Sequence, residues 1–201
     1  SDSLVGVRMV GTGDLVHQGA KGSIELIFSN SGQHATRHNY GKMATIAVAF
    51  DGKKGVSHSN VGRYEELAGR KLKQLKLAHP LWFLDWNQGY QDFAITGESE
   101  VDGQKTLVVS LTGENVPDRK VYVSATTGLI LKEEYVVISD AAGDVPITIT
   151  YSDYRDVNGI QLPFKTVSEN PFVGVSVVQF ETAEALTELP KDAFVVPPPK
   201  D

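Results

Sequence analysis

Four turn signals, each flanked by runs in which apolar and polar residues alternate, constrain the fold of this chain more than any other feature. They are Asp51-Gly52, Asp102-Gly103, Thr126-Thr127-Gly128 and Asn158-Gly159. Glycine tolerates the positive φ that a tight hairpin turn requires, and alternation places apolar side chains on one face of a strand. The sequence therefore predicts a large antiparallel sheet built from hairpins.

Strand-like runs cover most of the chain outside one central stretch. They occupy residues 4–10, 23–28, 34–40, 45–50, 93–97, 105–111, 120–124, 129–139, 146–154, 160–167 and 172–182. Within two of these runs, residues 129–138 and 172–180 are largely apolar on both faces, whereas a sheet with one solvated face alternates more cleanly. Part of the sheet is therefore expected either to be covered on both sides or to face a cavity. Ordinary packing of surface valines is the alternative explanation.

Residues 63–86 have a helical rather than an alternating pattern. Apolar residues recur there at three- to five-residue steps, and charged residues fill the opposite face. Pro80 is expected to end or kink the helix, because proline lacks a backbone donor. Apolar residues that include both tryptophans of the chain follow directly: Leu81, Trp82, Phe83, Leu84 and Trp86. Something must cover this surface, either protein alone or protein together with a ligand.

Composition excludes several classes of protein. The formal net charge of −6 argues against nucleic-acid binding and against electrostatic docking on anionic membranes. The chain has no cysteine, so it forms no disulfide and no cysteine-based metal site. No stretch approaches the roughly 20 apolar residues of a membrane span. The chain starts at Ser1 without Met and without a signal peptide, so we expect that a leader was removed or that the chain was excised from a longer one.

The motifs that could carry catalysis are incomplete. The segment Gly55-Val56-Ser57-His58-Ser59 lacks the second glycine of a nucleophile elbow. The segment Gly11-Thr12-Gly13 lacks the third glycine of a dinucleotide loop, and no lysine follows it as in a P-loop. These glycines are expected to mark a β-bulge or a turn.

The ionisable residues give no metal site and no catalytic pair by their spacing. His34 and His38 are four residues apart, but on a strand they would lie about 13 Å apart, too far to chelate one ion. The remaining histidines are expected at the surface or in loops: His17, His58 and His79. The adjacent pairs Glu65-Glu66 and Glu133-Glu134 should diverge, with solvated faces as the default. We therefore expect no catalytic residue, no metal and no cofactor.

Segments of the C-terminal half carry a resemblance to a known family. Residues 149–164, ITYSDYRDVNGIQLPF, resemble the signature hairpin of the LolA-like outer-membrane lipoprotein-sorting superfamily. Residues 121–130, VYVSATTGLI, are similar to the same family's strand-turn-strand unit, and residues 97–105, GESEVDGQK, to a turn that enters a strand. The ending LPKDAF at 189–194, with Pro197 beyond it, also matches. These are strand and turn signatures, so they indicate fold more than function.

The resemblance implies an α+β fold, in which a large curved antiparallel sheet forms an incomplete β-barrel with one or a few helices covering its concave face. A single domain would span residues 1–196, and residues 197–201 would form a proline-rich tail. Between sheet and helix, the resemblance implies an apolar cavity that receives acyl chains. In the carriers of this family a buried arginine holds a lid closed. Arg8 and Arg37 are the arginines of the N-terminal strands here.

On this resemblance, residues 63–86 would plug the half-barrel with an apolar face turned toward the cavity. The candidate lining residues are Leu67, Leu75, Leu81, Trp82, Phe83 and Trp86. From the helical phase we expect Leu67, Leu75, Trp82 and Trp86 to point at the concave face. By the same phase, the residues expected to point away are Lys71, Lys73 and Lys76.

The function that the resemblance implies is a non-enzymatic, periplasmic or otherwise extracytoplasmic domain that holds a lipid or a lipoprotein acyl chain. An alternative is a protein-interaction or sensor domain of the same fold, as an appendage of a larger secreted protein. A third possibility is an enzyme whose site forms only in three dimensions. No nucleic-acid partner and no transmembrane segment are expected. A continuous apolar cavity would favour the first hypothesis, and a filled core with an exposed apolar groove would favour the second.

Overall fold

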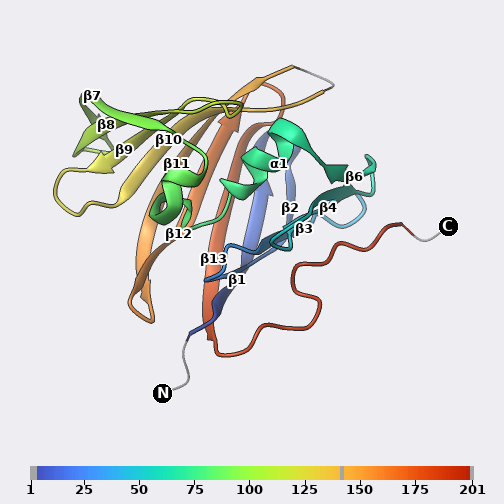
Figure 1. The fold of residues 1–201 in the computed structure, drawn as a ribbon. Helices are drawn as coiled ribbons and strands as arrows, with labels where there is room; N and C mark the ends of the chain where they lie inside the picture. The colour runs from blue at the N-terminus through green and yellow to red at the C-terminus, as the bar shows by residue number, and fades with distance from the viewer. Residues whose placement is uncertain (1–3, 141–142, 200–201) are drawn as a thin grey trace.

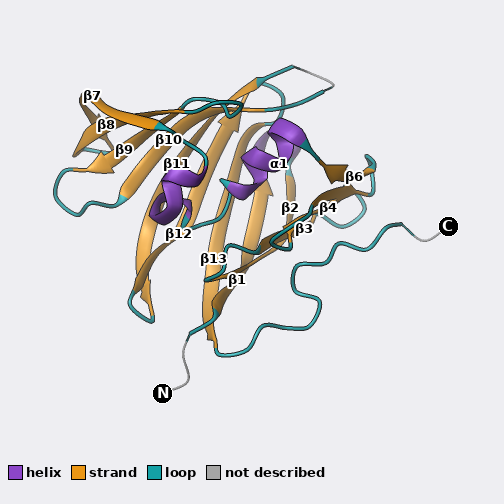
Figure 2. Cartoon of the chain, in the orientation of Figure 1, coloured by secondary structure: helices purple, strands orange, loops and turns teal. Residues whose placement is uncertain are grey.

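A continuous antiparallel sheet of 13 strands dominates the computed structural model, which describes residues 4–140 and 143–199. The strands are β1 (Gly6–Leu15), β2 (Ala20–Ser29), β3 (His34–Asn39), β4 (Thr45–Phe50), β5 (Gly55–Ser59), β6 (Tyr64–Leu67), β7 (Asp92–Val101), β8 (Gln104–Thr112), β9 (Arg119–Ser124), β10 (Ile130–Val137), β11 (Val145–Val157), β12 (Ile160–Asn170) and β13 (Gly174–Leu186). The sheet is strongly curved and its two edges do not meet (Figure 2). The predicted incomplete barrel is confirmed.

The strand order shows how the chain is routed. Across the sheet it reads β6-β5-β4-β3-β2-β1-β13-β12-β11-β10-β9-β8-β7. Two meanders, β1 to β6 and β7 to β13, therefore meet where β1 pairs with β13, with Gly6 opposite Leu186. Strands β6 and β7 follow each other in the chain but lie at opposite edges, so residues 68–91 must pass over one face of the sheet. We call them the crossing segment.

The crossing segment carries both of the longer helices in the described part of the chain, and the remaining one is the short turn η1 (Val16–Gln18). Helix α1 (Gly69–Lys76) comes first, and the 3-10 helix η2 (Trp82–Gln88) follows after a turn. Both lie over the concave face of the sheet (Figure 1). The predicted layout of helices over a curved sheet is therefore observed.

The helix predicted from residue 63, with an end or a kink at Pro80, is wrong in its extent. Its first part, Tyr64–Leu67, is the edge strand β6, which pairs with β5. Gly69, the first residue of α1, has a φ of +54°, so the helical backbone does not continue N-terminally past it, and α1 is only 8 residues long. Strand pairing with a neighbouring hairpin has overridden the helical spacing, because tertiary contacts outweigh weak local propensity. Strands β5 and β6 are also missing from the predicted strands.

The turn and bulge predictions from glycine are confirmed. Asn158 and Gly159 have φ values of 54° and 87°, and Asp102 and Gly103 have 48° and 77°, as a type I′ hairpin turn requires. In β1, the register against β13 shifts between Val10 and Gly11, which is a β-bulge. Gly11 thus serves the sheet rather than a ligand.

The C-terminal segment, residues 187–199, packs on the convex face of the first meander. Ala193 and Val196 are buried in a cluster with Ile27 of β2 and other strand residues. The guanidinium of Arg37 donates hydrogen bonds to the backbone oxygens of Ala193 (2.8 Å) and Val195 (3.3 Å). The following prolines, 197–199, are exposed, and residues 200–201 of the predicted tail lie outside the described residues.

Candidate ligand cavity

A cavity of about 910 Å³ lies between the concave face of the sheet and the crossing segment. Its sheet side is mainly apolar, with Met9, Leu26, Val121, Ile149 and Phe180 among the lining residues. Its other side is formed by residues 77–84 and Trp86. The volume lies in the upper part of the range, roughly 300–1,000 Å³, that is usual for small-molecule sites.

The structure separates the six predicted lining residues into two groups. Leu81, Trp82, Phe83 and Trp86 line the cavity. Leu67 and Leu75 lie beside Gly55 of β5, where a Cβ on that glycine would approach Leu75 Cδ2 to 2.6 Å. The structure thus brings four of the six together at the cavity and places the other two where α1 packs closely on β5. Ligand contact by any of them remains a prediction.

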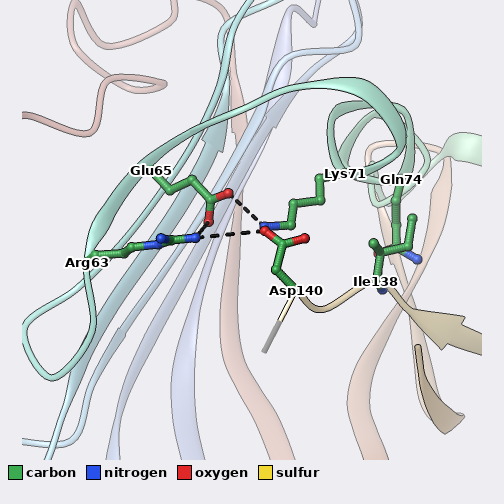
Figure 3. A network of polar contacts seen from close by, with 6 residues as sticks. All are labelled: Arg63, Glu65, Lys71, Gln74, Ile138 and Asp140. Atoms are coloured by element: carbon green, nitrogen blue, oxygen red, sulfur yellow. Dashed lines mark hydrogen bonds and ion pairs between the residues drawn. The ribbon is translucent and has the colours of Figure 1, made fainter. Parts of the chain in front are cut away.

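The three lysines of α1 are absent from the cavity lining. Figure 3 shows Lys71 between Glu65 of β6 and Asp140, which follows β10. Lys71 Nζ is 2.7 Å from Glu65 Oε1, and Arg63 Nη2 lies 3.8 Å from carboxylate oxygens of both acidic residues. These ion pairs link α1 and β6 to the other half of the sheet.

Gln74 adds a second link between α1 and the end of β10. Its Nε2 donates to the backbone oxygen of Val136 at 2.7 Å, and its Oε1 accepts from the backbone N–H of Ile138 at 3.0 Å. The amide thereby satisfies one donor and one acceptor where β10 ends. Helix α1 is therefore attached to the two halves of the sheet rather than resting on one.

A buried ion pair lies under η2, in the cavity wall formed by β9 and β10. Arg119 Nη1 is 3.3 Å from Glu133 Oε2, and both side chains are 4% exposed. The other carboxylate oxygen, Oε1, accepts a hydrogen bond of 3.2 Å from the indole N–H of Trp82. Both oxygens of Glu133 therefore face N–H donors. Burial raises the pKa of Glu133, and the adjacent Arg119 opposes that rise.

Arg119 also holds the crossing segment against the sheet. Its guanidinium lies 4.4 Å from the ring centroid of Trp82 and 4.5 Å from that of Tyr135, on β10. Its Nη1 donates to the backbone oxygen of Leu77 at 3.3 Å. Within the described residues, Arg119 Nε has no hydrogen-bond partner although it is buried. Cation–π contacts of this kind are stronger when desolvated.

Tyrosines complete this polar part of the wall. Tyr135 and Tyr151 line the cavity beside the ion pair, and burial raises the pKa of Tyr135 to about 12 and that of Tyr151 well above its usual value. Both hydroxyls are therefore protonated at neutral pH and can donate a hydrogen bond, and that of Tyr151 donates to the Glu133 carboxylate. Tyr154 donates its own to the backbone oxygen of Ile130.

A second buried polar contact joins the crossing segment to the first meander. His79 Nε2 donates to the backbone oxygen of Ser29 at 3.0 Å, while Nδ1 accepts from the backbone N–H of Leu81 at 3.1 Å. His79 lies in the loop between α1 and η2, which is one of the two places expected for it, but at 8% exposed it is buried rather than at the surface. Its ring packs at 5.6 Å on that of His34, from β3, and at 5.4 Å on Phe28.

Other expectations for the ionisable residues are met only in part. Arg8 and Arg37 both pair with Glu25 on the convex face and neither is buried, whereas Arg119 is buried in the cavity wall. Glu133 and Glu134 diverge as predicted, but Glu133 is buried rather than solvated. Among residues 4–140 and 143–199, no group of three or more potential ligands could hold a metal ion. No helix in those ranges is long and apolar enough to cross a membrane.

Sequence reasoning missed the residues that give the wall its polarity. Adjacent residues on a strand point to opposite faces, so one of Glu133 and Glu134 had to face inward. That signal was present in the sequence. Nothing local distinguished Arg119, because its partners come from the crossing segment and from another strand.

Comparison with known proteins identifies the fold. No protein-family model and no curated protein matches the chain. Among solved structures, a LolA superfamily protein from Nitrosomonas europaea is 15% identical with a TM-score of 0.60, and the match covers 97% of this chain and 90% of that one. A putative outer membrane lipoprotein-sorting protein domain from Vibrio parahaemolyticus is 13% identical with a TM-score of 0.61, covering 95% and 88%.

A third similar structure is a DUF1329 family protein from Desulfovibrio piger, which is 15% identical. Its TM-score is 0.63, and the match covers 96% of this chain and 91% of that one. These likenesses extend over nearly the whole chain, so the half-barrel fold expected from the resemblance to LolA-like proteins is confirmed. At such low sequence identity, these matches establish the fold but do not identify a ligand.

Proposed function

We propose that this protein is a non-enzymatic, extracytoplasmic binding domain that holds the acyl chain of a lipid or a lipoprotein. The observation that supports this most directly is the apolar cavity of about 910 Å³ beneath the crossing segment. Burying an acyl chain there would contribute about 0.8 kcal/mol per CH₂ removed from water. No covalent step is needed, so binding and release would depend on access to the cavity alone.

The structural neighbours support the same proposal by their names. One is a LolA superfamily protein and another a putative outer membrane lipoprotein-sorting protein domain. A periplasmic or other extracytoplasmic location follows from the proposed role. Leu81, Trp82, Phe83 and Trp86 are the proposed contacts from the crossing segment, because all four line the cavity.

A pair of substitutions on one strand tests the proposal. Val178 of β13 lines the cavity, whereas its neighbour Val177, which points to the other face, is not among the lining residues. Val178→Trp should fill part of the cavity and reduce binding of a fluorescent fatty acyl probe at least tenfold. Val177→Trp should leave binding within a factor of two of wild type. Equal binding by all three proteins would contradict the proposal.

The second candidate is a protein-interaction or sensor domain. It is favoured by exposed apolar residues near the cavity mouth, on η2 and the edge strand β7: Phe83, Leu84, Phe93 and Ile95. Patches of this kind mark interaction sites. Native mass spectrometry of protein purified from cells separates the two candidates. Co-purified lipid would support the acyl-binding function. A protein that carries no lipid and does not bind added acyl probes would favour the protein-interaction function.

A further inference from the structure

The polar part of the cavity wall carries opposite charges that cancel. Arg119 and Glu133 are each 4% exposed and pair at 3.3 Å. Each carboxylate oxygen faces an N–H donor, from Arg119 and from Trp82. A protonated carboxyl would instead need an acceptor for its own O–H, so this geometry suits the ionised form. A buried arginine is always charged, and here its counter-charge is already supplied by the protein.

No other charged group lines the cavity among the described residues. Apart from the ion pair, the ionisable lining residues are tyrosines and two histidines, His38 and His79. Burial lowers the pKa of both histidines, so both are neutral at neutral pH. An anionic ligand would therefore find no free cation inside the cavity, and it would approach the charge of Glu133.

The wall does offer hydrogen-bond donors. Arg119 Nε–H is buried without a partner among the described residues. The hydroxyl of Tyr135, protonated at neutral pH, stands on the same wall, whereas the Tyr151 hydroxyl on the neighbouring strand already donates to the Glu133 carboxylate. An uncharged acceptor of the ligand, such as an ester or amide carbonyl, can accept a hydrogen bond from such a donor. No ligand charge is then buried without a counter-charge.

From these contacts we infer that the cavity selects uncharged acyl ligands, that is acyl esters or amides rather than free fatty acids, and that Glu133 sets this selectivity by neutralising Arg119. The inference rests on the proposed function, because it concerns the ligand of the same cavity. It assigns to Glu133 a role in specificity that is separate from holding η2 in place.

The test compares two ligands with the same chain and different headgroup charge. Dodecanoic acid and N-methyldodecanamide are measured at pH 8, where the acid is ionised, by displacement of a fluorescent alkyl probe. The wild-type protein should bind the amide at least tenfold more tightly. Equal affinities, or tighter binding of the acid, would overturn the inference. If neither ligand binds, the proposed function itself fails, and the two failures are thereby told apart.

Glu133→Gln supplies the sharper result, because it leaves Arg119 without its counter-charge while keeping the size of the side chain. The preference should shift toward the acid by at least tenfold relative to wild type, as the ligand carboxylate replaces the missing one. A merely structural role would weaken both ligands alike. Glu134→Gln is the matched control, since Glu134 bonds Lys132 and Tyr122 outside the cavity, and it should retain the wild-type ratio. Should Glu133→Gln fail to fold, the wild-type ratio decides alone.

Discussion

Two buried side chains, Arg119 and His79, anchor the crossing segment to the sheet. Arg119 contacts the ring of Trp82 and the backbone of Leu77, and His79 bonds the backbone of Ser29. Each anchor joins a polar group of the crossing segment to a polar group of the sheet. Because buried polar groups are costly when left unpaired, these contacts fix one position of the segment rather than many.

His34 makes the stability of the protein depend on pH. Burial lowers the pKa of His34 from 6.5 to about 4. Its surroundings hold His79, Phe50 and, over the ring of Phe50, the Lys76 ammonium. Between pH 6.5 and about 4, His34 is therefore protonated in the unfolded chain but not in the folded chain. Stability is complete above this window and falls as the pH drops through it, by about 3 kcal/mol in all.

Urea unfolding at pH 7.5 and pH 5 measures this effect. His34→Phe removes the titrating group and keeps an aromatic ring, so the variant should lose about 2 kcal/mol less than wild type between the two pH values. His58→Phe, at a partly exposed position on β5, should keep the wild-type dependence because His34 remains. Identical pH dependence of wild type and His34→Phe would contradict the prediction.

At this scale the sequence was least informative. Spacing excluded a His34–His38 metal site, but it could not show that His34 meets His79, 45 positions away in the chain and across the interface with the crossing segment. The partners of Arg119 are equally distant in sequence. Long-range contacts among single polar residues leave no periodic pattern to read.

Among the elements, the central pairing of β1 with β13 depends on close backbone approach. At the bulge in β1, a Cβ on Gly11 would lie 2.0 Å from the backbone oxygen of Gln179 and 2.5 Å from Phe180 Cα. Those are backbone atoms of the neighbouring strand, so they cannot move aside as a flexible side chain could. The two meanders are joined through a position that tolerates no side chain.

Gly11→Ala should therefore lower the free energy of unfolding by about 1–3 kcal/mol, the usual effect of overpacking. Gly97→Ala in β7 is the control, because a Cβ there would meet nothing within 4 Å. Equilibrium urea unfolding of both variants and the wild type gives the comparison. Equal losses for the two variants would count against the close approach in β1.

Elements were predictable where local pattern and turn chemistry agreed. The hairpin at Asn158-Gly159 follows from φ preferences that the sequence states directly, and the bulge at Gly11 falls where a glycine had marked a bulge or a turn. The helix was predicted to begin too early, at residue 63, because Tyr64–Leu67 fits a helical spacing and also fits an edge strand. Only its pairing with β5, which the sequence does not display, decides between the two.

For the whole molecule, the convex face of the first meander needs the C-terminal segment as its cover. Ala193 and Val196 pack on Ile27, Ala35 and Ala49, all of which are buried. Without this cover, several apolar side chains of β2 to β4 would meet water. Their loss of burial would cost about 25 cal/mol per Å² of apolar surface that becomes exposed.

Deleting residues 188–201 should accordingly lower the thermal unfolding temperature by several degrees, because the deletion removes that cover and the hydrogen bonds of Arg37. Deleting only residues 197–201 should change the unfolding temperature little, since Pro197, Pro198 and Pro199 are exposed. Differential scanning calorimetry measures both deletions. Similar unfolding temperatures for the long deletion and the intact chain would show that the segment is dispensable.

The strand order has a consequence for how the chain reaches its native state. Every strand pairs with a neighbour in the chain except at one seam, where β1 meets β13 and Gly6 meets Leu186. Contacts this remote in sequence slow folding, because the loop entropy is lost before the contacts form. Until β1 and β13 pair, each meander exposes a long unpaired strand, which can pair with a strand of another molecule. Refolding yield should therefore fall as protein concentration rises, although the finished sheet hides both strands at its centre.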